Sequence, residues 1–247
     1  MCRGAFSRAT KADKGDFNTV TPTEIEREFA ALQPWITKFV IEGRAYGGQF
    51  DALQDGRLTQ FRQCFPSAQE ILELGSLEGG HTIGLARQAG VRRVVGIEAR
   101  QENLARATLA KKLLGANNIE FVQANLEATD LASYGKFDAL FCSGLLYHLP
   151  EPWLLVQQFP RVSQNLFLWT HYAADPTADT LVNGYRGIWY QEGGIADPLS
   201  GVSATSFWPT LGSLLAMLQE NGYRSVHILD NQTQHPHGPG VTLAASM

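Results

Sequence analysis

Apolar and polar residues alternate regularly between residues 70 and 170 of the chain. Short apolar runs, which predict strands, cover residues 70–74, 93–98, 119–123, 137–142 and 165–170. Amphipathic segments between them, which predict helices, cover residues 80–88, 101–114, 127–133 and 151–159. Short apolar strands that alternate with helices are typical of a parallel sheet covered on both faces. The pattern therefore predicts an α/β fold.

The residues before this region predict a different kind of structure. Residues 1–20 carry no apolar run and are expected to form an arm. The run Thr-Pro-Thr-Glu at 21–24 is a helix-start signal. Apolar residues from Ile25 to Val40 recur every three to four positions, which predicts a helix that Pro34 breaks or kinks. With a second short helix around 58–64, residues 1–65 are predicted to be an arm and helical cover.

The rhythm of strands and helices stops after residue 170. Residues 172–207 are rich in glycine, aspartate and aromatic residues. A long irregular stretch inside a compact domain is usually functional, so we expect a substrate lid there. A helix over 209–221 precedes two strands over 224–230 and 241–246, whose short connection makes them antiparallel. Residues 66–247 thus predict a mostly parallel, Rossmann-like seven-stranded sheet that ends in an antiparallel hairpin.

The turn after the first of these strands is rich in glycine. It reads Ile-Leu-Glu-Leu-Gly-Ser-Leu-Glu-Gly-Gly over residues 71–80. Glycines at such a turn allow a ligand to approach the backbone, because a Cβ would collide with it. The turn lacks the Gly-x-Gly-x-x-Gly that places a dinucleotide pyrophosphate at a helix N-terminus. An ordinary strand–helix turn with a solvated Glu73 is the alternative interpretation.

A carboxylate also ends the second strand. Glu98 is the last residue of the run Val-Val-Gly-Ile-Glu, which is the next predicted strand after the glycine turn and the helix that follows it. A carboxylate at this position can accept both ribose hydroxyls of a nucleoside. Together with Glu73, Glu98 predicts a nucleoside site without distinguishing S-adenosylmethionine (SAM) from a nicotinamide cofactor.

The end of the fourth strand narrows the choice of cofactor. Residues 143–152 read Ser-Gly-Leu-Leu-Tyr-His-Leu-Pro-Glu-Pro. This run, the irregular glycine turn and the terminal hairpin resemble class I SAM-dependent methyltransferases. The branch they resemble includes tRNA wobble-uridine carboxymethyltransferases and small-molecule methyltransferases.

The resemblance implies roles for several residues. The amino-acid end of SAM would lie against Gly75, Gly79, Ser143 and Gly144, with Glu73 orienting its ammonium group. Asn125 would face the adenine amino group while Leu126 packs on the ring, although Asn125 equally suits the N-cap of the next helix.

Two histidines are candidates for acid–base chemistry. His148 can take a proton from a hydroxyl during methyl transfer, and His171 at the end of the fifth strand is the second candidate. A helix-capping or core role is the alternative for His148. Trp189, Tyr190 and Glu192 are candidates for lining an aromatic pocket, or for packing a lid on the domain's own core.

Composition limits the possible partners. The net charge is −4 with no long basic run, so a nucleic-acid partner is not expected. The three cysteines are scattered, and the histidines and aspartates match no ligand spacing, so no disulfide framework or metal site is predicted. No signal or membrane-spanning segment is evident, which favours a cytoplasmic protein with no membrane partner.

The sequence therefore predicts a SAM-dependent methyltransferase that O-methylates a small-molecule metabolite by in-line transfer. The alternatives are a tRNA-modifying (carboxy)methyltransferase and a catalytically inactive partner protein that binds SAM or S-adenosylhomocysteine (SAH). A nicotinamide-dependent oxidoreductase is a further alternative, disfavoured by the missing glycine motif. The acceptor, the methylated atom and the oligomeric state stay open.

Overall fold

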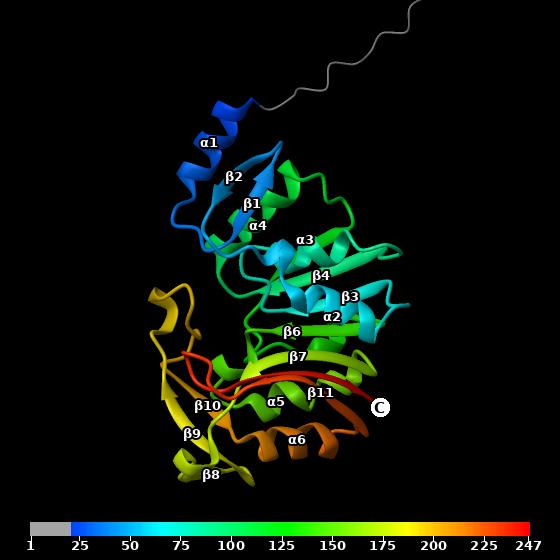
Figure 1. Cartoon of the computed structure of the whole chain (residues 1–247), viewed down its shortest axis with the longest axis vertical. Helices are drawn as coiled ribbons and strands as arrows, with labels where there is room; N and C mark the ends of the chain where they lie inside the picture. Colours follow the sequence, from blue (N-terminus) through cyan, green and yellow to red (C-terminus); the bar gives the residue numbers. More distant parts are fainter. Residues whose placement is uncertain (1–20) are drawn as a thin grey trace, which may run out of the picture.

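The structure is a computed structural model that describes residues 21–247 (Figure 1). Its helices are α1 (Pro22–Ala31), α2 (Gly56–Cys64), α3 (Gly80–Ala86), α4 (Gln101–Leu113), α5 (Pro152–Val156) and α6 (Leu211–Glu220). Its strands are β1 (Lys38–Ile41), β2 (Arg44–Gly47), β3 (Glu70–Leu74), β4 (Arg93–Glu98), β5 (Ile119–Gln123), β6 (Ala139–Ser143), β7 (Asn165–His171), β8 (Thr180–Val182), β9 (Tyr185–Gln191), β10 (Thr205–Pro209), β11 (Ser225–Gln232) and β12 (Gly240–Ser246). Short 3-10 helices are η1 (Ala52–Gln54), η2 (Leu131–Tyr134), η3 (Leu146–His148), η4 (Phe159–Arg161), η5 (Asp175–Thr177) and η6 (Gly194–Ala196). The arm predicted for residues 1–20 lies outside the described residues.

The central sheet has seven strands in the order β11-β12-β7-β6-β3-β4-β5. The strands from β7 to β5 are parallel, whereas β12 runs antiparallel to both β7 and β11. The predicted mostly parallel sheet with a C-terminal antiparallel hairpin is thus confirmed. The chain order reverses between β3 and β6. In open α/β sheets, ligands bind at the carboxyl ends of the strands next to such a reversal.

Both faces of the sheet are covered, because successive strand residues point to opposite sides. In β3, Ile71 packs into a core with α1 to α4, while Leu72 and Leu74 pack into a core with α5, α6, β9 and β10. Figure 1 shows these two groups of helices on opposite sides of the sheet. Strands β3, β4 and β5 begin and end where the apolar runs predicted. The runs of β3 and β4 are buried on both faces, whereas β5 is the partly exposed edge strand of the sheet.

The N-terminal cover is a helix followed by a hairpin. Thr21 and Glu24 form a reciprocal capping box at the start of α1, as the start signal predicts. The predicted continuation of this helix to Val40 is wrong, because α1 ends at Ala31 and residues 38–41 pair with β2. Phe39 is buried while Val40 is 51% exposed, which is the alternation of a strand.

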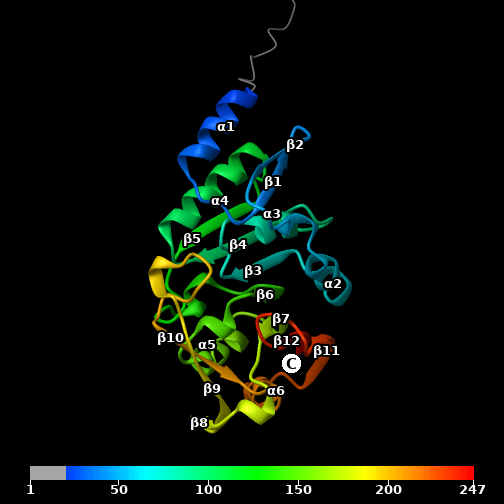
Figure 2. The same ribbon diagram turned by 60° about the vertical axis from the view of Figure 1, so that its left-hand side comes forward.

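Residues 172–207 are more regular than predicted. Strands β8, β9 and β10 form a three-stranded antiparallel sheet outside the central one (Figure 2). Gly187 permits this pairing, since a Cβ there would lie 2.2 Å from the carbonyl oxygen of Trp208. Residues 192–203, which lie between β9 and β10 and include η6, form an otherwise irregular segment, the 192–203 loop. It follows β9 and reaches back to the end of β4.

Two predicted helices are shorter than expected. The helix predicted over 127–133 is replaced by a turn at residues 126–128 and by η2, and the helix predicted over 151–159 divides into α5 and η4. Pro160 lies within η4, and a proline inside a continuing helix would remove a backbone hydrogen bond. Within residues 21–247, no helix is long and apolar enough to cross a membrane.

Candidate active site

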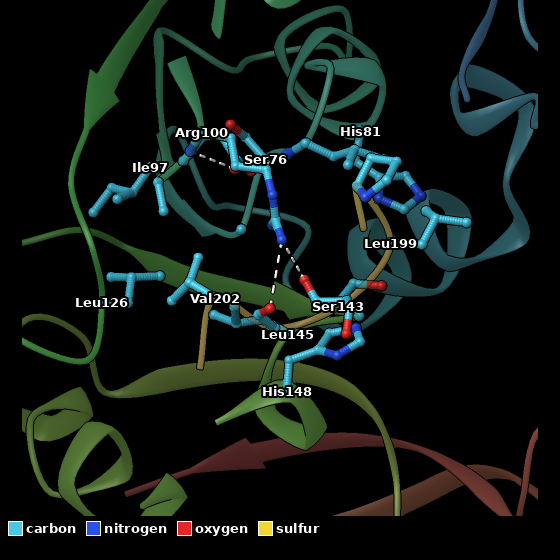
Figure 3. Close-up of a pocket in the computed structure, with 18 of the residues that line it drawn as sticks. Ser76, His81, Ile97, Arg100, Leu126, Ser143, Leu145, His148, Leu199 and Val202 are labelled. Atoms are coloured by element: carbon cyan, nitrogen blue, oxygen red, sulfur yellow. Dashed lines mark hydrogen bonds between the residues drawn. The ribbon is translucent and has the colours of Figure 1, made fainter. Parts of the chain in front are cut away.

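A cavity of about 490 Å³ opens at the carboxyl ends of β3, β4, β5, β6 and β7. Its floor comes from the turns that follow these strands. Its walls come from the N-terminal cover, the 192–203 loop and the turn between β11 and β12. Figure 3 shows Ser76, Leu126, Ser143 and His148 around this one cavity. These four residues lie at or just after the ends of β3, β5 and β6, and the fold brings them together although the sequence separates them by up to 72 positions (76 to 148).

The glycine turn lines the cavity through Gly75, Ser76, Leu77 and Gly80, whereas Gly79 does not line it. Gly75 has a φ of +78°, a conformation that glycine adopts readily, and its backbone N–H donates to the carbonyl of Ile97. Gly79 begins α3, and a Cβ there would lie 2.6 Å from the ring of Phe121. Gly79 therefore packs between α3 and the sheet, and its contact with the cofactor stays a prediction.

Glu78 in the same turn joins the N-terminal cover to the site. Its carboxylate accepts hydrogen bonds from the backbone N–H groups of Ile36, at 3.0 Å, and Thr37, at 2.6 Å. The Glu78 side chain is fully buried, and Arg106 lies 3.8 Å away. Ile36 and Thr37 both line the cavity, so this carboxylate holds one wall in place.

Glu73 lies beneath the cavity and does not line it. The side chain is buried and accepts a hydrogen bond from the hydroxyl of Thr82 in α3. Burial raises the pKa of Glu73 to about 8; the hydrogen bond from Thr82 opposes this shift and the charge of Glu98 adds to it. The structure thus places the carboxyl group of Glu73 on the core side of the cavity floor, and its contact with the ammonium of SAM stays a prediction.

Replacing Glu73 by glutamine should change how stability depends on pH. Because its pKa is raised from 4.5 to about 8, folded Glu73 keeps a proton that the unfolded chain releases. The free energy of unfolding therefore falls by up to about 1.4 kcal/mol per pH unit between these two values. Glutamine has no proton to lose, so Glu73→Gln should gain stability relative to wild type by about 2 kcal/mol from pH 6 to pH 8. Urea unfolding at several pH values measures this, and a difference that stays constant contradicts it.

Glu98 lines the cavity at the end of β4. Its two carboxylate oxygens accept hydrogen bonds from the backbone N–H groups of Leu77 and Arg100, each at 2.9 Å. Burial raises the pKa of Glu98, while these hydrogen bonds and one from Asn103 lower it in part. The backbone contacts fix the carboxylate at the cavity edge and leave it lone pairs for a ligand.

Asn125 and Leu126 also line the cavity. The side-chain oxygen of Asn125 accepts a hydrogen bond from the backbone N–H of Glu127 at 3.0 Å, which stabilises a turn and not the predicted helix. Leu126 is largely buried in the core beside β4 and β5 and exposes part of its surface to the cavity. Leu126 and Ile97 thus provide an apolar wall next to the polar edge of Glu98.

Ser143 and Gly144 end β6 at the opposite side of the cavity. Gly144 has a φ of +82°, and Ser143 accepts a hydrogen bond at 2.8 Å from the guanidinium of Arg57. The Arg57 guanidinium also lies 4.7 Å from the ring of Trp169 in β7. Arg57 therefore spans from the N-terminal cover to two strand ends.

A charged cluster that the sequence analysis missed holds Arg57 in place. Asp55 accepts hydrogen bonds from Arg57, at 2.9 Å from Nε, and lies 3.0 Å from Nε2 of His81. Burial raises the pKa of Asp55, but the hydrogen bonds from His81 and Arg57 outweigh it and hold this pKa well below its usual range. The sequence signal was only an aspartate at the N-cap of α2, which is common at helix starts.

The two histidines predicted for catalysis lie in different environments. His148 lines the cavity, and its Nδ1 lies 3.1 Å from a carboxylate oxygen of Glu192. His171 does not line the cavity; its Nδ1 lies 2.9 Å from the carbonyl of Gly238, and its ring stacks on Trp208. Burial lowers the pKa of His171 and backbone carbonyls raise it in part. The contacts of His171 are thus those of a packed residue outside the cavity, and its catalytic role stays a prediction.

The aromatic candidates of the outer sheet do not reach the cavity. Trp189 and Tyr190 are 47% and 44% exposed, and neither lines the cavity. Their aromatic contacts are with Phe207 and Trp208 of β10, as expected for packing within the outer sheet. His237, in the turn between β11 and β12, also lines the cavity.

Comparisons with known proteins show which family and which solved structures this chain resembles. The family described as "Methyltransferase domain" matches residues 72–165. The N-terminal domain of EvdMO1 with SAH bound is 34% identical, covers 92% of this chain and 97% of that domain, and superposes with a TM-score of 0.82. A structure of that domain in the presence of SAH and D-fucose is 35% identical over 91% of this chain and 95% of that one, with a TM-score of 0.81.

This chain also matches two longer proteins over only part of their length. A tRNA U34 carboxymethyltransferase of Alteromonas mediterranea is 22% identical over 88% of this chain, which spans 64% of that protein's length. The chain likewise spans 47% of the whole EvdMO1 chain. The EvdMO1 domain is 34–35% identical to this chain over more than nine tenths of its length. The matched methyltransferase domain and the order of the strands agree with that similarity. The chain belongs to the class I SAM-dependent methyltransferases.

Proposed function

We propose that this methyltransferase transfers the methyl group of SAM to a hydroxyl oxygen of a small, polyhydroxylated acceptor of the sugar class. The observation that carries the proposal is the position of His148, whose imidazole lines the same cavity as Glu98, Ser143 and Gly144. A hydroxyl keeps its proton at neutral pH and needs a base as its oxygen is methylated. A histidine beside the cofactor residues supplies that base.

The residues of the cavity fit SAM. The hydroxyl of Ser76 is buried at the cavity wall without a hydrogen-bond partner in the described part of the chain, as expected of a group that binds a ligand. Glu98 would accept the ribose hydroxyls. The guanidinium of Arg57 and the backbone at Gly75 and Gly144 would hold the amino-acid end of SAM. Both glycines have a positive φ, and neither has a side chain that would lie between the backbone and the ligand.

The chemistry of the cofactor leaves the protein two tasks. When bound, SAM supplies a methyl group on a positively charged sulfur, which an acceptor oxygen takes while neutral SAH is left. The chain has to align the acceptor hydroxyl with the cofactor, and alignment of two reactants in a closed site lowers the barrier substantially. His148 has to take the hydroxyl proton at its Nε2 atom.

A sugar acceptor is supported by two observations. The EvdMO1 domain, 35% identical, was crystallised in the presence of D-fucose. In this chain, Tyr147, Trp169 and His237 line the cavity near His148, and such rings offer large flat surfaces with polar edges. Flat aromatic walls with a few polar groups suit the apolar faces and the hydroxyls of a sugar ring.

Methyl-labelled SAM tests the proposal directly. We expect the purified protein to transfer label to one or more of D-fucose and a panel of hexoses and 6-deoxyhexoses, and to form a methyl ether visible by NMR. Sugars already methylated at the accepting hydroxyl should receive no label. Transfer to unmodified tRNA with none to any sugar contradicts the sugar acceptor and supports the nucleic-acid acceptor suggested by the tRNA-modifying relative.

A further inference from the structure

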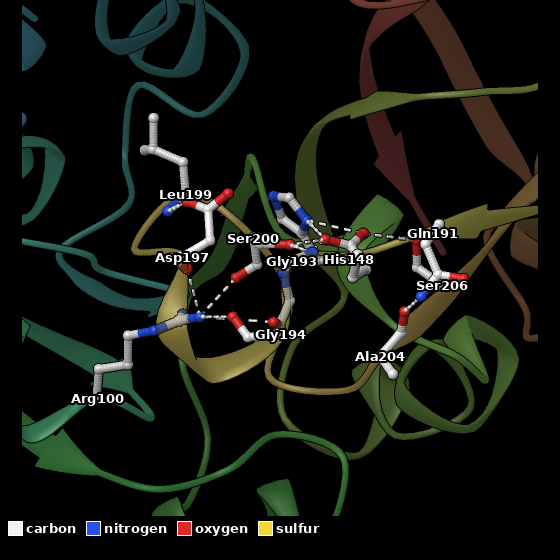
Figure 4. A network of polar contacts seen from close by, with 12 residues as sticks. Arg100, His148, Gln191, Gly193, Gly194, Asp197, Leu199, Ser200, Ala204 and Ser206 are labelled. Carbon is white, nitrogen blue, oxygen red and sulfur yellow. Dashed lines mark hydrogen bonds and ion pairs between the residues drawn. The ribbon is translucent and has the colours of Figure 1, made fainter.

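The carboxylate of Glu192, at the start of the 192–203 loop, accepts an unusual number of hydrogen bonds. Its donors are the hydroxyl of Ser206 at 2.7 Å, the backbone N–H of Gly201 at 2.8 Å and the hydroxyl of Ser200. Nδ1 of His148 lies 3.1 and 3.2 Å from its two oxygens. The Glu192 side chain is 1% exposed, so this is a buried charge whose partners are supplied by the protein. Figure 4 shows the imidazole of His148 facing this network.

The hydrogen bonds keep Glu192 ionised. Burial raises its pKa, but the hydrogen bonds from His148, Ser200, Ser206 and Gly201 outweigh this effect and lower the pKa to about 2. An ionised carboxylate can only accept hydrogen bonds. The proton shared with His148 therefore lies on Nδ1, and in the neutral imidazole the lone pair lies on Nε2.

The 192–203 loop is also fixed at its other side. The guanidinium of Arg100 donates to the backbone carbonyls of Ser200 at 2.8 Å, Asp197 at 2.9 Å and Gly194 at 3.2 Å. Arg100 follows Glu98 by two residues at the end of β4 (Figure 4). The loop that carries Glu192 and two of its donors, Ser200 and Gly201, is thus attached to the strand end that carries Glu98, and residues 198–202 line the cavity.

We propose that Glu192 is a positioning residue for the methyl transfer: it holds His148 in the tautomer and orientation in which Nε2 takes the proton of the acceptor hydroxyl. The inference rests on the proposed function, because only an acceptor that keeps its proton needs this base. If Glu192 had only a structural role, the hydrogen bonds from Ser200, Gly201 and Ser206 would be sufficient, and no contact with the imidazole of His148 would be needed. The contact with His148 links the loop to the chemistry.

Glu192→Gln tests the proposal because glutamine keeps the shape and loses the charge and one acceptor. We expect kcat to fall about 10- to 100-fold, with the affinity for SAH and the KM for SAM changed less than twofold. Glu192→Asp, which keeps the charge, should recover part of the lost kcat. Glu220→Gln is the matched control: Glu220 accepts a hydrogen bond from Tyr185 of β9, away from the cavity, and its loss should leave kcat unchanged.

A readout that does not depend on turnover separates this inference from the proposed function. In the SAH-bound protein, NMR should show a low-field Nδ1–H signal of His148 that is absent in His148→Ala and lost or shifted in Glu192→Gln. If that signal changes as expected but no hydroxyl acceptor is methylated, the proposed function fails while the positioning of His148 stands. An Nε2–H tautomer in the wild type, or wild-type kcat in Glu192→Gln, overturns the positioning role. If Glu192→Gln does not fold, the tautomer of His148 in the wild type decides: an Nδ1–H form supports the proposal and an Nε2–H form overturns it.

Discussion

Replacing His148 by alanine is expected to lower kcat by a factor of about 10² to 10⁴, the usual range for loss of a general base. His148 lines the cavity and its Nδ1 is bound to Glu192, so the lost group is the Nε2 atom available to the acceptor. Steady-state kinetics with a hydroxyl acceptor measures the effect. Calorimetry with SAH should show an affinity changed less than twofold, because His148 takes a proton from the acceptor and is not needed to hold the cofactor.

Two further histidine variants serve as controls for this result. His227→Ala removes an exposed imidazole of β11 that is bound to Ser225, and it should leave kcat unchanged. His171→Ala removes a buried ring that packs on Trp208, so it should lower stability more than kcat at a temperature where the variant is folded. A wild-type kcat in His148→Ala would show that the acceptor loses its proton by another route.

Replacing Glu98 by alanine is expected to weaken SAH binding by a factor of about 10² or more. Hydrogen bonds to a charged group contribute about 1.5–3 kcal/mol each, and two ribose hydroxyls would donate to this carboxylate. The variant also loses the acceptors of the Leu77 and Arg100 backbone N–H groups, which shape the cavity edge. Calorimetry gives the affinity. Glu102→Gln, a change of carboxylate in the first turn of α4 outside the cavity, should have no effect.

The binding at Glu98 should also depend on pH. Burial raises the pKa of Glu98, so its neutral form persists to a higher pH than that of an exposed glutamate. A protonated carboxyl loses one acceptor position, and binding should therefore weaken as pH falls. Glu98→Gln cannot be protonated in this way, so we expect its affinity to be lower than that of wild type at neutral pH and less dependent on pH. Equal pH dependence in the two proteins contradicts the ribose role.

The strands of the parallel sheet were the most predictable part of the fold. In β3, β4 and β5, continuous apolar runs end at turn residues, and local pattern alone decides both ends. The prediction that α1 continues to Val40 was wrong because the same spacing of apolar residues also suits a helix followed by a strand. The pairing of β1 with β2 decided the outcome there. The strands β8 to β10 were missed because glycines and exposed aromatics hide their pattern.

The site shows the same division between local and long-range information. Glu98, Asn125, Leu126, Ser143, Gly144 and His148 follow strand ends in the parallel sheet, and all line the cavity. Glu73 and Gly79 follow the same sequence pattern, but packing against Thr82 and Phe121 turns them toward the core. Arg57 and Glu192 carry no motif, and each reaches the site from a segment outside the parallel sheet.

The sequence by itself determined the class of fold, the nucleoside site and the family resemblance, because hydrophobic period and turn chemistry act over a few neighbouring residues. Only the tertiary structure decided which charged side chains complete the site. The contact between His148 and Glu192 joins residues 44 positions apart, and that between Arg57 and Ser143 joins residues 86 positions apart. Such contacts depend on how the N-terminal cover and the 192–203 loop pack on the sheet, and no local pattern in the chain records that packing.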